Sequence, residues 1–184
     1  MSRVLSVLVL LALAGATWWL AGPEEPATDA GAGDRPAAGT TVPVGAFAMR
    51  VDSVVDGDTF RARVERVNDV VTTADRISIR LVGIDTPETY PDTECWGPEA
   101  TDAARGLMPE GSTVMVAPDQ DSWDQYGRRL FHVWADGQWV NGALVEDGHA
   151  EAKRYWPNVT RHEDLVALME SAREAGRGQW GACG

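Results

Sequence analysis

The segment ISIRLVGIDTPE, residues 77–88, decides how the rest of the chain is interpreted. Apolar residues alternate over positions 77–81, which predicts a strand with one buried face. Arg80 falls on the opposite face, and Asp85 and Glu88 follow where the strand gives way to a loop. A guanidinium, a candidate metal ligand and a candidate base therefore lie close together in the sequence.

Four more strands are expected around this one. Residues 47–55 and 58–66 alternate well and meet at Asp56-Gly57, a dipeptide typical of tight hairpins. Residues 112–117 and 129–135 have the same strand character. The loop from 68 to 75 should form a looser turn before the strand that carries Arg80.

Three helices are expected as well. One begins at Gly97-Pro98 and ends before Pro109, because proline suits the first turn of a helix and not its interior. A second spans 139–147. A third begins with Thr160 as its cap and has Glu163 three residues later, the pattern of a capping box. Strands mostly first and helices mostly later predict the α+β class.

The N-terminal part differs from the rest in composition. Residues 4–22 carry no charged side chain, so segment 1–22 is interpreted as a cleavable secretory signal or an uncleaved membrane anchor, and both remain open. Residues 23–45 are rich in Pro, Ala, Gly, Thr and Asp, which is typical of a disordered linker. The folded domain is expected at 46–184. The protein should be secreted or extracytoplasmic, and tethered where the first segment is retained.

Only two cysteines occur, Cys95 and Cys183. In an exported protein an isolated pair is most simply a disulfide, and two free thiols are the alternative.

The charge balance limits the kinds of partner. The chain has 16 Lys and Arg residues against 28 Asp and Glu residues, a net charge of −12. A protein that binds phosphate backbones without sequence preference is normally basic. Any binding to nucleic acid must therefore depend on a local cluster and on a metal. All but one of the basic residues are arginine, which can hold phosphate with two parallel hydrogen bonds.

Two further motifs extend the chemistry of segment 77–88. Asp56-Gly57-Asp58-Thr59 adds carboxylates, and Tyr126-Gly127-Arg128 adds a second guanidinium. Carboxylates that hold a hard cation and arginines that bind phosphate oxygens are the groups that phosphodiester hydrolysis uses. Alone, Asp58 also fits a hairpin turn, Asp85 a turn before proline, and Glu88 an exposed loop.

Taken in order along the chain, these motifs resemble the staphylococcal nuclease, or thermonuclease, family. The resemblance covers about residues 48–180. It implies a five-stranded barrel of the oligonucleotide-binding type with three helices, forming a nuclease domain at 46–184. The motifs that carry it are DGDT at 56–59, RLVGIDTPET at 80–89, GPEA at 97–100, YGR at 126–128 and VNGALV at 140–145.

The resemblance implies a calcium site. Asp58 and Asp85 would bind the ion through their carboxylates, and Thr86 would bind it through its backbone carbonyl. Calcium takes six to eight oxygen ligands in general, so water and a phosphate oxygen can complete the shell.

The resemblance also implies the catalytic and substrate-binding residues. Arg80, Glu88 and Arg128 would be catalytic, with Glu88 either a general base or a group that only orients the attacking water. Tyr126 and Tyr155 would contact the nucleotide.

The expected function is that of a monomeric, calcium-dependent endonuclease. It would hydrolyse DNA and RNA, preferably single-stranded, with little sequence preference and with 3′-phosphate and 5′-hydroxyl ends. One alternative is a barrel of the same fold that binds single strands or nucleotides without cleavage. Another is a surface domain that calcium stabilises. The joint presence of Arg80, Glu88 and Arg128 favours the enzyme, because binding alone does not require the glutamate.

Some features are less specific. Asp119, Asp121 and Asp124 share one loop, but their pattern departs from the EF-hand, so a solvated acidic loop is expected rather than a second calcium site. The three histidines lack ligand spacing and are expected to be structural. Most of the eight tryptophans should lie in the core, and any exposed ones offer stacking faces for bases.

Overall fold

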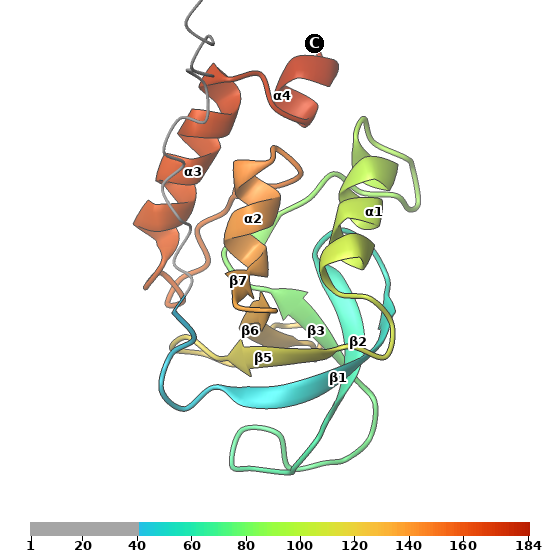
Figure 1. Cartoon of the computed structure of the whole chain (residues 1–184), viewed down its shortest axis with the longest axis vertical. Coiled ribbons are helices and arrows are strands. Elements are labelled where there is room, and N and C mark those ends of the chain that lie inside the picture. Colours follow the sequence, from blue (N-terminus) through green and yellow to red (C-terminus); the bar gives the residue numbers. More distant parts are fainter. Residues whose placement is uncertain (1–40) are drawn as a thin grey trace, which may run out of the picture. The chain divides into compact units, whose positions relative to one another are not determined.

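A computed structural model describes residues 41–184 of the chain (Figure 1). The predicted signal or anchor at 1–22 and the linker positions 23–40 lie outside the described residues. Val42, which belongs to the predicted linker, packs against the core. No helix within 41–184 is long and apolar enough to cross a membrane.

Five strands close into a barrel, which confirms the predicted α+β fold. In the sheet, β3 pairs with β2, β2 with β1, β1 with β5 and β5 with β6, and a parallel pairing of β3 with β6 closes the ring. Closure leaves no long open edge on the barrel. The strands are β1 (Phe47–Val54), β2 (Thr59–Val64), β3 (Ile77–Leu81), β5 (Thr113–Ala117) and β6 (Arg129–Ala135).

Three helices accompany the barrel, as expected. They are α1 (Gly97–Leu107), α2 (Val140–Glu146) and α3 (His162–Glu174), and Figure 1 shows all three on the same side of the strands. Helix α2 packs against both α3 and β6. Its residues 140–145 are all buried, so α2 forms the centre of the helical layer.

The core fills the barrel and the space beneath the helices. Its largest fully buried side chains include Phe60, Phe131, Trp134 and Trp139. The side chain of Asn141 is also buried, and it accepts a hydrogen bond from the backbone of Val133 at 2.9 Å. Because buried backbone groups need partners, this asparagine joins α2 to the barrel wall.

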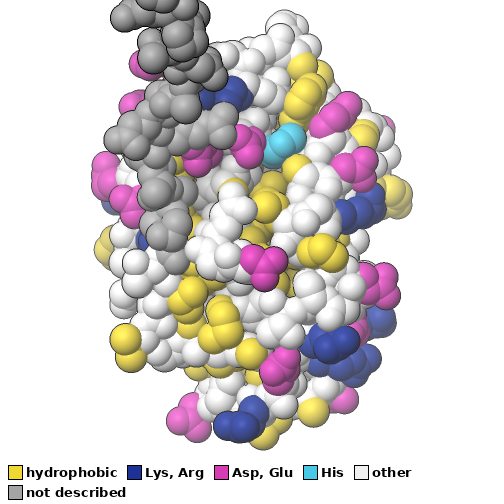
Figure 2. All heavy atoms as spheres, in the orientation of Figure 1, with side chains coloured by type: hydrophobic (Ala, Val, Ile, Leu, Met, Phe, Trp, Pro, Cys, Tyr) yellow, Lys and Arg dark blue, Asp and Glu magenta, His cyan; other side chains and the backbone are white. Residues whose placement is uncertain are grey.

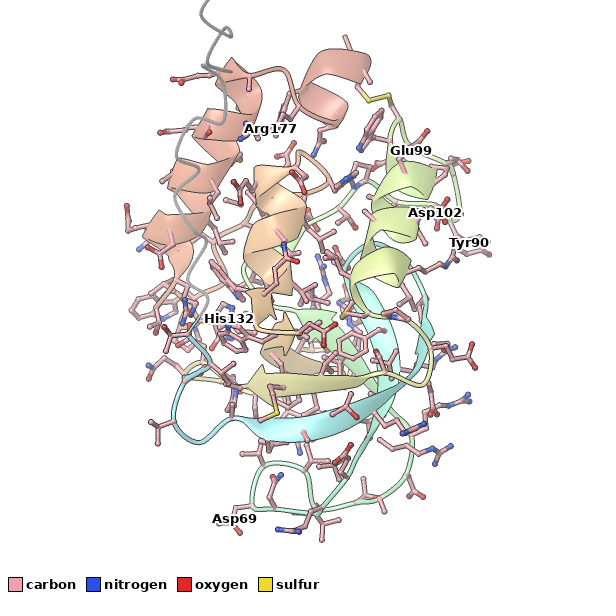
Figure 3. The ribbon with its side chains drawn as sticks, in the orientation of Figure 1. Asp69, Tyr90, Glu99, Asp102, His132 and Arg177 are labelled. Carbon is pink, nitrogen blue, oxygen red and sulfur yellow. A yellow bond between two sulfur atoms is a disulfide. The ribbon has the colours of Figure 1, made fainter. Side chains whose placement is uncertain are left out.

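Short elements complete the fold. They are β4 (Ile84–Asp85), β7 (Gln138–Trp139), β8 (Glu151–Ala152) and α4 (Gln179–Ala182). Strand β4 pairs with β8, which places Asp85 opposite Glu151. The cysteines are joined as a Cys95–Cys183 disulfide, which links the segment before α1 to the end of α4 (Figure 3).

The predicted capping box at Thr160 is wrong. Helix α3 begins at His162, and no side chain caps its first turn. The Thr160 hydroxyl instead donates to Oδ1 of Asp119 at 2.5 Å, and its backbone N–H donates to Oδ2 at 3.0 Å. The Thr160 hydroxyl therefore binds the carboxylate of Asp119, from a distant loop, and does not cap the helix.

Candidate active site

The centre of the candidate site is the guanidinium of Arg80, which lies between two carboxylates. Arg80 Nη1 is paired with Oδ2 of Asp58, and Arg80 Nη2 lies 2.6 Å from Oδ1 of Asp85. The side chains of Arg80 and Asp58 are buried, whereas that of Asp85 is 39% exposed. Two aspartates that are far apart in the chain therefore meet on one cation, with one of them open to solvent.

Strand register explains why these groups meet. Thr59 of β2 pairs with Arg80 of β3, so the turn that precedes β2 is brought beside the arginine. Arg80 also pairs with Leu130 of β6, which brings the loop before β6 to the same end of the barrel. The closing β3–β6 pairing thus assembles the site from three separate motifs.

Close packing holds Asp58 in place. Its Oδ2 accepts hydrogen bonds from the backbone N–H and the hydroxyl of Thr86, at 3.0 and 3.1 Å. A Cβ atom at Gly57 would lie only 2.7 Å from the Thr86 hydroxyl oxygen. Glycine is therefore required at position 57 for the turn to approach the 85–86 segment this closely.

Glu88 lies on a loop that closes on itself. Its backbone N–H donates to the Glu94 carboxylate and its carbonyl accepts from the Glu94 backbone N–H, both at 2.9 Å. Glu94 precedes the disulfide-bonded Cys95. Burial, and then the nearby carboxylates of Asp56, Asp85 and Glu94, raise the pKa of the Glu88 carboxyl, while Arg80 opposes them. The Glu88 carboxylate therefore belongs to the same charge cluster as Arg80.

Arg128 is oriented by an acid from its own loop. Its Nε donates to Oδ2 of Asp124 at 2.6 Å, and its Nη1 donates to the Thr59 hydroxyl at 3.3 Å. Burial raises the pKa of Asp124, but hydrogen bonds from Arg128 and Tyr126 outweigh it and lower that pKa. Asp124 therefore stays ionised and points the guanidinium of Arg128 towards β2.

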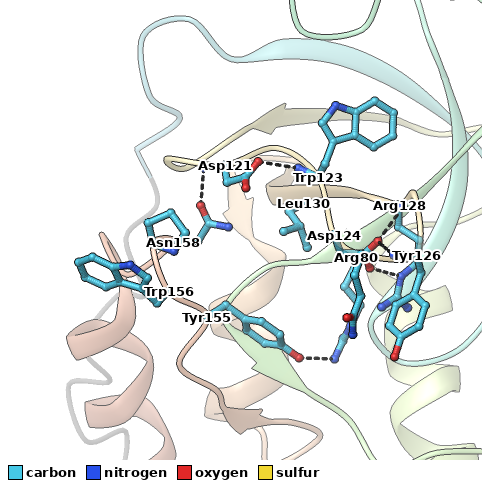
Figure 4. Close-up of a pocket in the computed structure, with 12 residues that line it drawn as sticks. Arg80, Asp121, Trp123, Asp124, Tyr126, Arg128, Leu130, Tyr155, Trp156 and Asn158 are labelled. Atoms are coloured by element: carbon cyan, nitrogen blue, oxygen red, sulfur yellow. Dashed lines mark hydrogen bonds and ion pairs between the residues drawn. The ribbon is translucent and has the colours of Figure 1, made fainter.

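Both predicted nucleotide-contacting tyrosines line one pocket with the arginines. The pocket has a volume of about 400 Å³, and Arg80, Arg128, Tyr126 and Tyr155 are among its walls (Figure 4). Arg80 Nη2 donates to the Tyr155 hydroxyl at 3.3 Å. Tyr126 is 75% exposed, and the Arg128 guanidinium lies 5.5 Å from its ring centre. The pocket thus combines guanidinium donors with aromatic surfaces.

Sequence reasoning counted Asp56 among the carboxylates of the Asp56-Gly57-Asp58-Thr59 motif but gave it no role of its own at the site. Burial raises the pKa of its carboxyl, while Arg80 and Arg128 act on it in the opposite direction. Its Oδ1 also accepts a hydrogen bond from the backbone of Asp58 at 3.2 Å. The available signal was the second acid of the Asp-Gly-Asp motif, which places two carboxylates on one tight turn.

The carboxylates of the predicted acidic loop all contact protein groups. Asp119 binds Thr160, Asp121 accepts the backbone N–H of Trp123 at 3.2 Å, and Asp124 binds Arg128. Within 41–184, no three His, Cys, Asp or Glu side chains are grouped so that they alone could hold a metal ion. Any ion at the candidate site would therefore need oxygen ligands besides the two aspartates.

With further oxygen ligands, the residues at the site fit a hard divalent cation. Asp58 and Asp85 each bring a carboxylate to the Arg80 guanidinium, and carboxylate oxygens are the ligands that calcium prefers. The exposure of Asp85 leaves room for water or a phosphate oxygen to complete a coordination shell. A positive charge already stabilises both aspartates there, namely that of Arg80.

The sequence is similar to known nucleases. Residues 78–182 match the family described as staphylococcal nuclease homologue. The chain is 30% identical over 136 residues to a thermonuclease of Staphylococcus hyicus, covering 71% of this chain and 74% of that protein. It is 33% identical over 145 residues to a thermonuclease of Staphylococcus intermedius, covering 77% and 79%. It is 37% identical over 134 residues to an uncharacterised endonuclease of Escherichia coli O157:H7, covering 71% and 75%.

Proposed function

The chain belongs to the staphylococcal nuclease family, and on that premise we propose that it is a calcium-dependent endonuclease that hydrolyses DNA and RNA. The observation that carries the proposal is the meeting of Asp58 and Asp85 on Arg80, beside a pocket that Arg128 shares. A scaffold that only binds nucleotides has no need to hold two acids where a phosphate is to bind, because they repel it.

Arg80 and Arg128 bind the phosphate that is to be cleaved. Each guanidinium has further N–H donors besides those that contact Asp58, Asp85 and Asp124, and hydrogen bonds from these donors to phosphate oxygens strengthen as negative charge builds up in the transition state. Asp124 and the Thr59 hydroxyl orient Arg128 before substrate arrives. Prior orientation lowers the barrier, because the donors need not reorganise during the reaction.

Glu88 binds the attacking water on the side of the cluster where Asp56 and Asp85 lie. The water oxygen forms the new bond to phosphorus, and the bond from phosphorus to the 5′ oxygen breaks. The departing oxygen takes a proton and becomes a 5′-hydroxyl, which leaves a 3′-phosphate. Glu88 accepts the proton of the water or fixes its direction of attack, and both roles require a carboxylate at this position.

Asp58, Asp85 and the backbone carbonyl of Thr86 would hold the calcium ion. When bound, the ion would neutralise charge on the phosphoryl group and lower the pKa of a bound water. Arg80 then has a second task, since its contacts hold the two carboxylates close to each other.

Tyr126 and Tyr155 would contact the nucleotide next to the cleaved bond, since both line the pocket with the arginines. Aromatic faces stack on any base and guanidinium groups bind any phosphate, which supports cleavage with little sequence preference. We further propose that the protein acts as a monomer outside the cytoplasm. Its nuclease domain, at 46–184, would be either secreted or tethered to the membrane. The Cys95–Cys183 disulfide supports an oxidising compartment.

Incubation of the purified protein with denatured DNA and RNA tests the proposal. Cleavage with calcium that stops when a chelator is added supports the enzyme. Retention of the strand on a gel without cleavage would support a non-catalytic binding module instead. A melting temperature that rises with calcium, with neither cleavage nor retention, would support a calcium-stabilised surface domain.

A further inference from the structure

We propose that Trp156 and Trp123 are stacking platforms for unpaired bases on either side of the cleavage site, so that the enzyme holds an extended single strand. The inference rests on the proposed nuclease function and adds to it two binding residues. Each base of a single strand has two free faces, and stacking on an aromatic side chain stabilises binding whatever the base.

Exposed aromatic side chains gather at this pocket. Four aromatic side chains within 41–184 are exposed, and three of them, Trp123, Tyr126 and Trp156, line the pocket that contains Arg80 and Arg128. The fourth is Tyr90. Large apolar side chains that cluster on a surface indicate a binding site more strongly than single exposed ones do.

Trp156 extends the pocket beyond Tyr155. Its side chain is 79% exposed, and it follows directly after the tyrosine whose hydroxyl accepts a hydrogen bond from Arg80. The segment is anchored two residues later, where Oδ1 of Asn158 accepts the backbone N–H groups of Gln120 and Asp121 at 3.0 and 2.7 Å. The indole therefore stands on a fixed backbone at the edge of the site.

Trp123 lies at the other end of the pocket. In Figure 4, Trp156 lies at the left and Trp123 at the upper right, while Tyr155 and Arg80 lie lower in the view, between Trp156 and Tyr126. The Arg129 guanidinium lies 3.6 Å from the centre of the Trp123 ring, and Nη1 of the buried Arg129 donates to the Ser122 hydroxyl at 3.0 Å. This arginine fixes one face of the indole, and 48% of the Trp123 side chain remains exposed.

The net negative charge of the protein explains why stacking on these platforms would matter for binding a strand. The chain has a net charge of −12, and on the face in Figure 2 acidic side chains are spread among the basic ones. Long polyanions gain little from counter-ion release on such a protein. Stacking does not depend on that release, so aromatic contacts can hold a strand where lysines are missing. A duplex keeps its bases stacked on one another, so the platforms select single strands.

Steady-state cleavage of two substrates tests the inference. One is a single-stranded oligothymidylate longer than the pocket, and the other is a mononucleotide with a small ester on its 5′-phosphate, whose nucleoside product is measured by chromatography. Trp156→Ala and Trp123→Ala should each raise KM for the oligonucleotide roughly tenfold and leave kcat unchanged. The same variants should leave both constants for the mononucleotide ester unchanged, because it does not reach the platforms.

Two controls separate stacking from loss of structure. Trp156→Phe keeps an aromatic face and should restore most of the oligonucleotide KM. Val67→Ala removes an exposed apolar side chain outside the pocket and should change nothing. The loss in Trp156→Ala should also be similar at low and high salt, whereas loss of a phosphate contact would shrink as salt rises.

Several outcomes would overturn the inference. If KM for the oligonucleotide is the same in both alanine variants as in the wild type, neither tryptophan contributes to strand binding. Equal losses on the two substrates assign the tryptophans to the fold or to the chemistry instead. If the wild type cleaves neither substrate, the proposed function fails. Quenching of tryptophan fluorescence by the oligonucleotide then still measures whether Trp156→Ala weakens binding.

Discussion

The Nε atom of Arg128 donates a 2.6 Å hydrogen bond to Oδ2 of Asp124, and the backbone N–H of Arg128 donates to Oδ1 of the same residue at 2.8 Å. Asp124 also accepts the backbone N–H of Tyr126 at 2.9 Å. The Asp124 carboxylate therefore fixes both the backbone of the loop before β6 and the direction of the Arg128 guanidinium. Arg128 has its position set before any substrate binds.

Asp124→Asn should lower kcat between about 10- and 100-fold, because the amide cannot hold the guanidinium with a charged acceptor. KM for the mononucleotide ester should change less, since Arg80 still binds phosphate. Asp124→Glu should recover part of the activity, and Asp121→Asn in the same loop serves as a matched control. Equal activity of Asp124→Asn and Asp121→Asn would show that Asp124 does not position Arg128.

Arg128→Lys should lower kcat by roughly 100-fold with the fold intact, because lysine keeps the charge and loses the two-pronged donor. The measurement is turnover with denatured DNA, together with circular dichroism and calcium binding, which should match the wild type. Arg61→Lys, on an exposed position of β2, is the control. Nearly normal turnover in Arg128→Lys would refute the catalytic role.

Reduction of the Cys95–Cys183 disulfide should lower the free energy of unfolding by roughly 4 kcal/mol, because the bond closes a loop between residues 88 positions apart. Urea denaturation with and without reductant measures the loss. A variant with Cys95→Ser and Cys183→Ser should have the lower stability already and should not respond to reductant. A reductant effect of equal size in that variant would show that the bond is not its cause.

Acid should destabilise the fold partly through His132, a buried residue of β6 that is labelled in Figure 3. Burial and the nearby Arg161 lower the pKa of His132 to about 4, with Asp119 opposing them. Its usual pKa is 6.5. As pH falls from 6.5 to 4, His132 therefore becomes protonated in the unfolded chain but stays neutral in the folded protein. The free energy of unfolding falls by roughly 3 kcal/mol over this range. Above pH 6.5 this contribution is constant.

Urea denaturation of wild type and His132→Gln over that pH range isolates the effect. The variant lacks the titrating ring, so its stability should fall less steeply with acid. Parallel curves for the two proteins would contradict the assignment, and a gap that closes as the pH falls from 6.5 to 4 would support it.

Much of the fold was predictable because its signals are local. The alternation around Asp56-Gly57 gave the first hairpin, and Gly97-Pro98 gave the start of α1. Closure of the barrel depends on β3 meeting β6, a pairing between distant segments that no local pattern specifies. Only the resemblance to a family indicated it in advance.

The errors also have non-local causes. Thr160 had the sequence of a helix cap, yet Asp119 from the loop after β5 accepts its hydroxyl. Asp124 was expected to belong to a solvated acidic loop, and its ion pair with Arg128 was not foreseen. Asp56 was given no role of its own, because its place in the charge cluster arises only when β3 and β6 bring the arginines to the turn. In each case a contact made by folding decided the role.

The calcium dependence of cleavage in Asp85→Asn is the most direct test of the claim that Asp58 and Asp85 form one metal-binding catalytic site. The calcium concentration for half-maximal cleavage of denatured DNA should rise roughly tenfold or more in this variant, because a ligand charge is lost. Asp92→Asn, in the exposed loop after Glu88, should match the wild type. Superimposable calcium curves for Asp85→Asn and the wild type, or undiminished cleavage in chelator, would contradict the account.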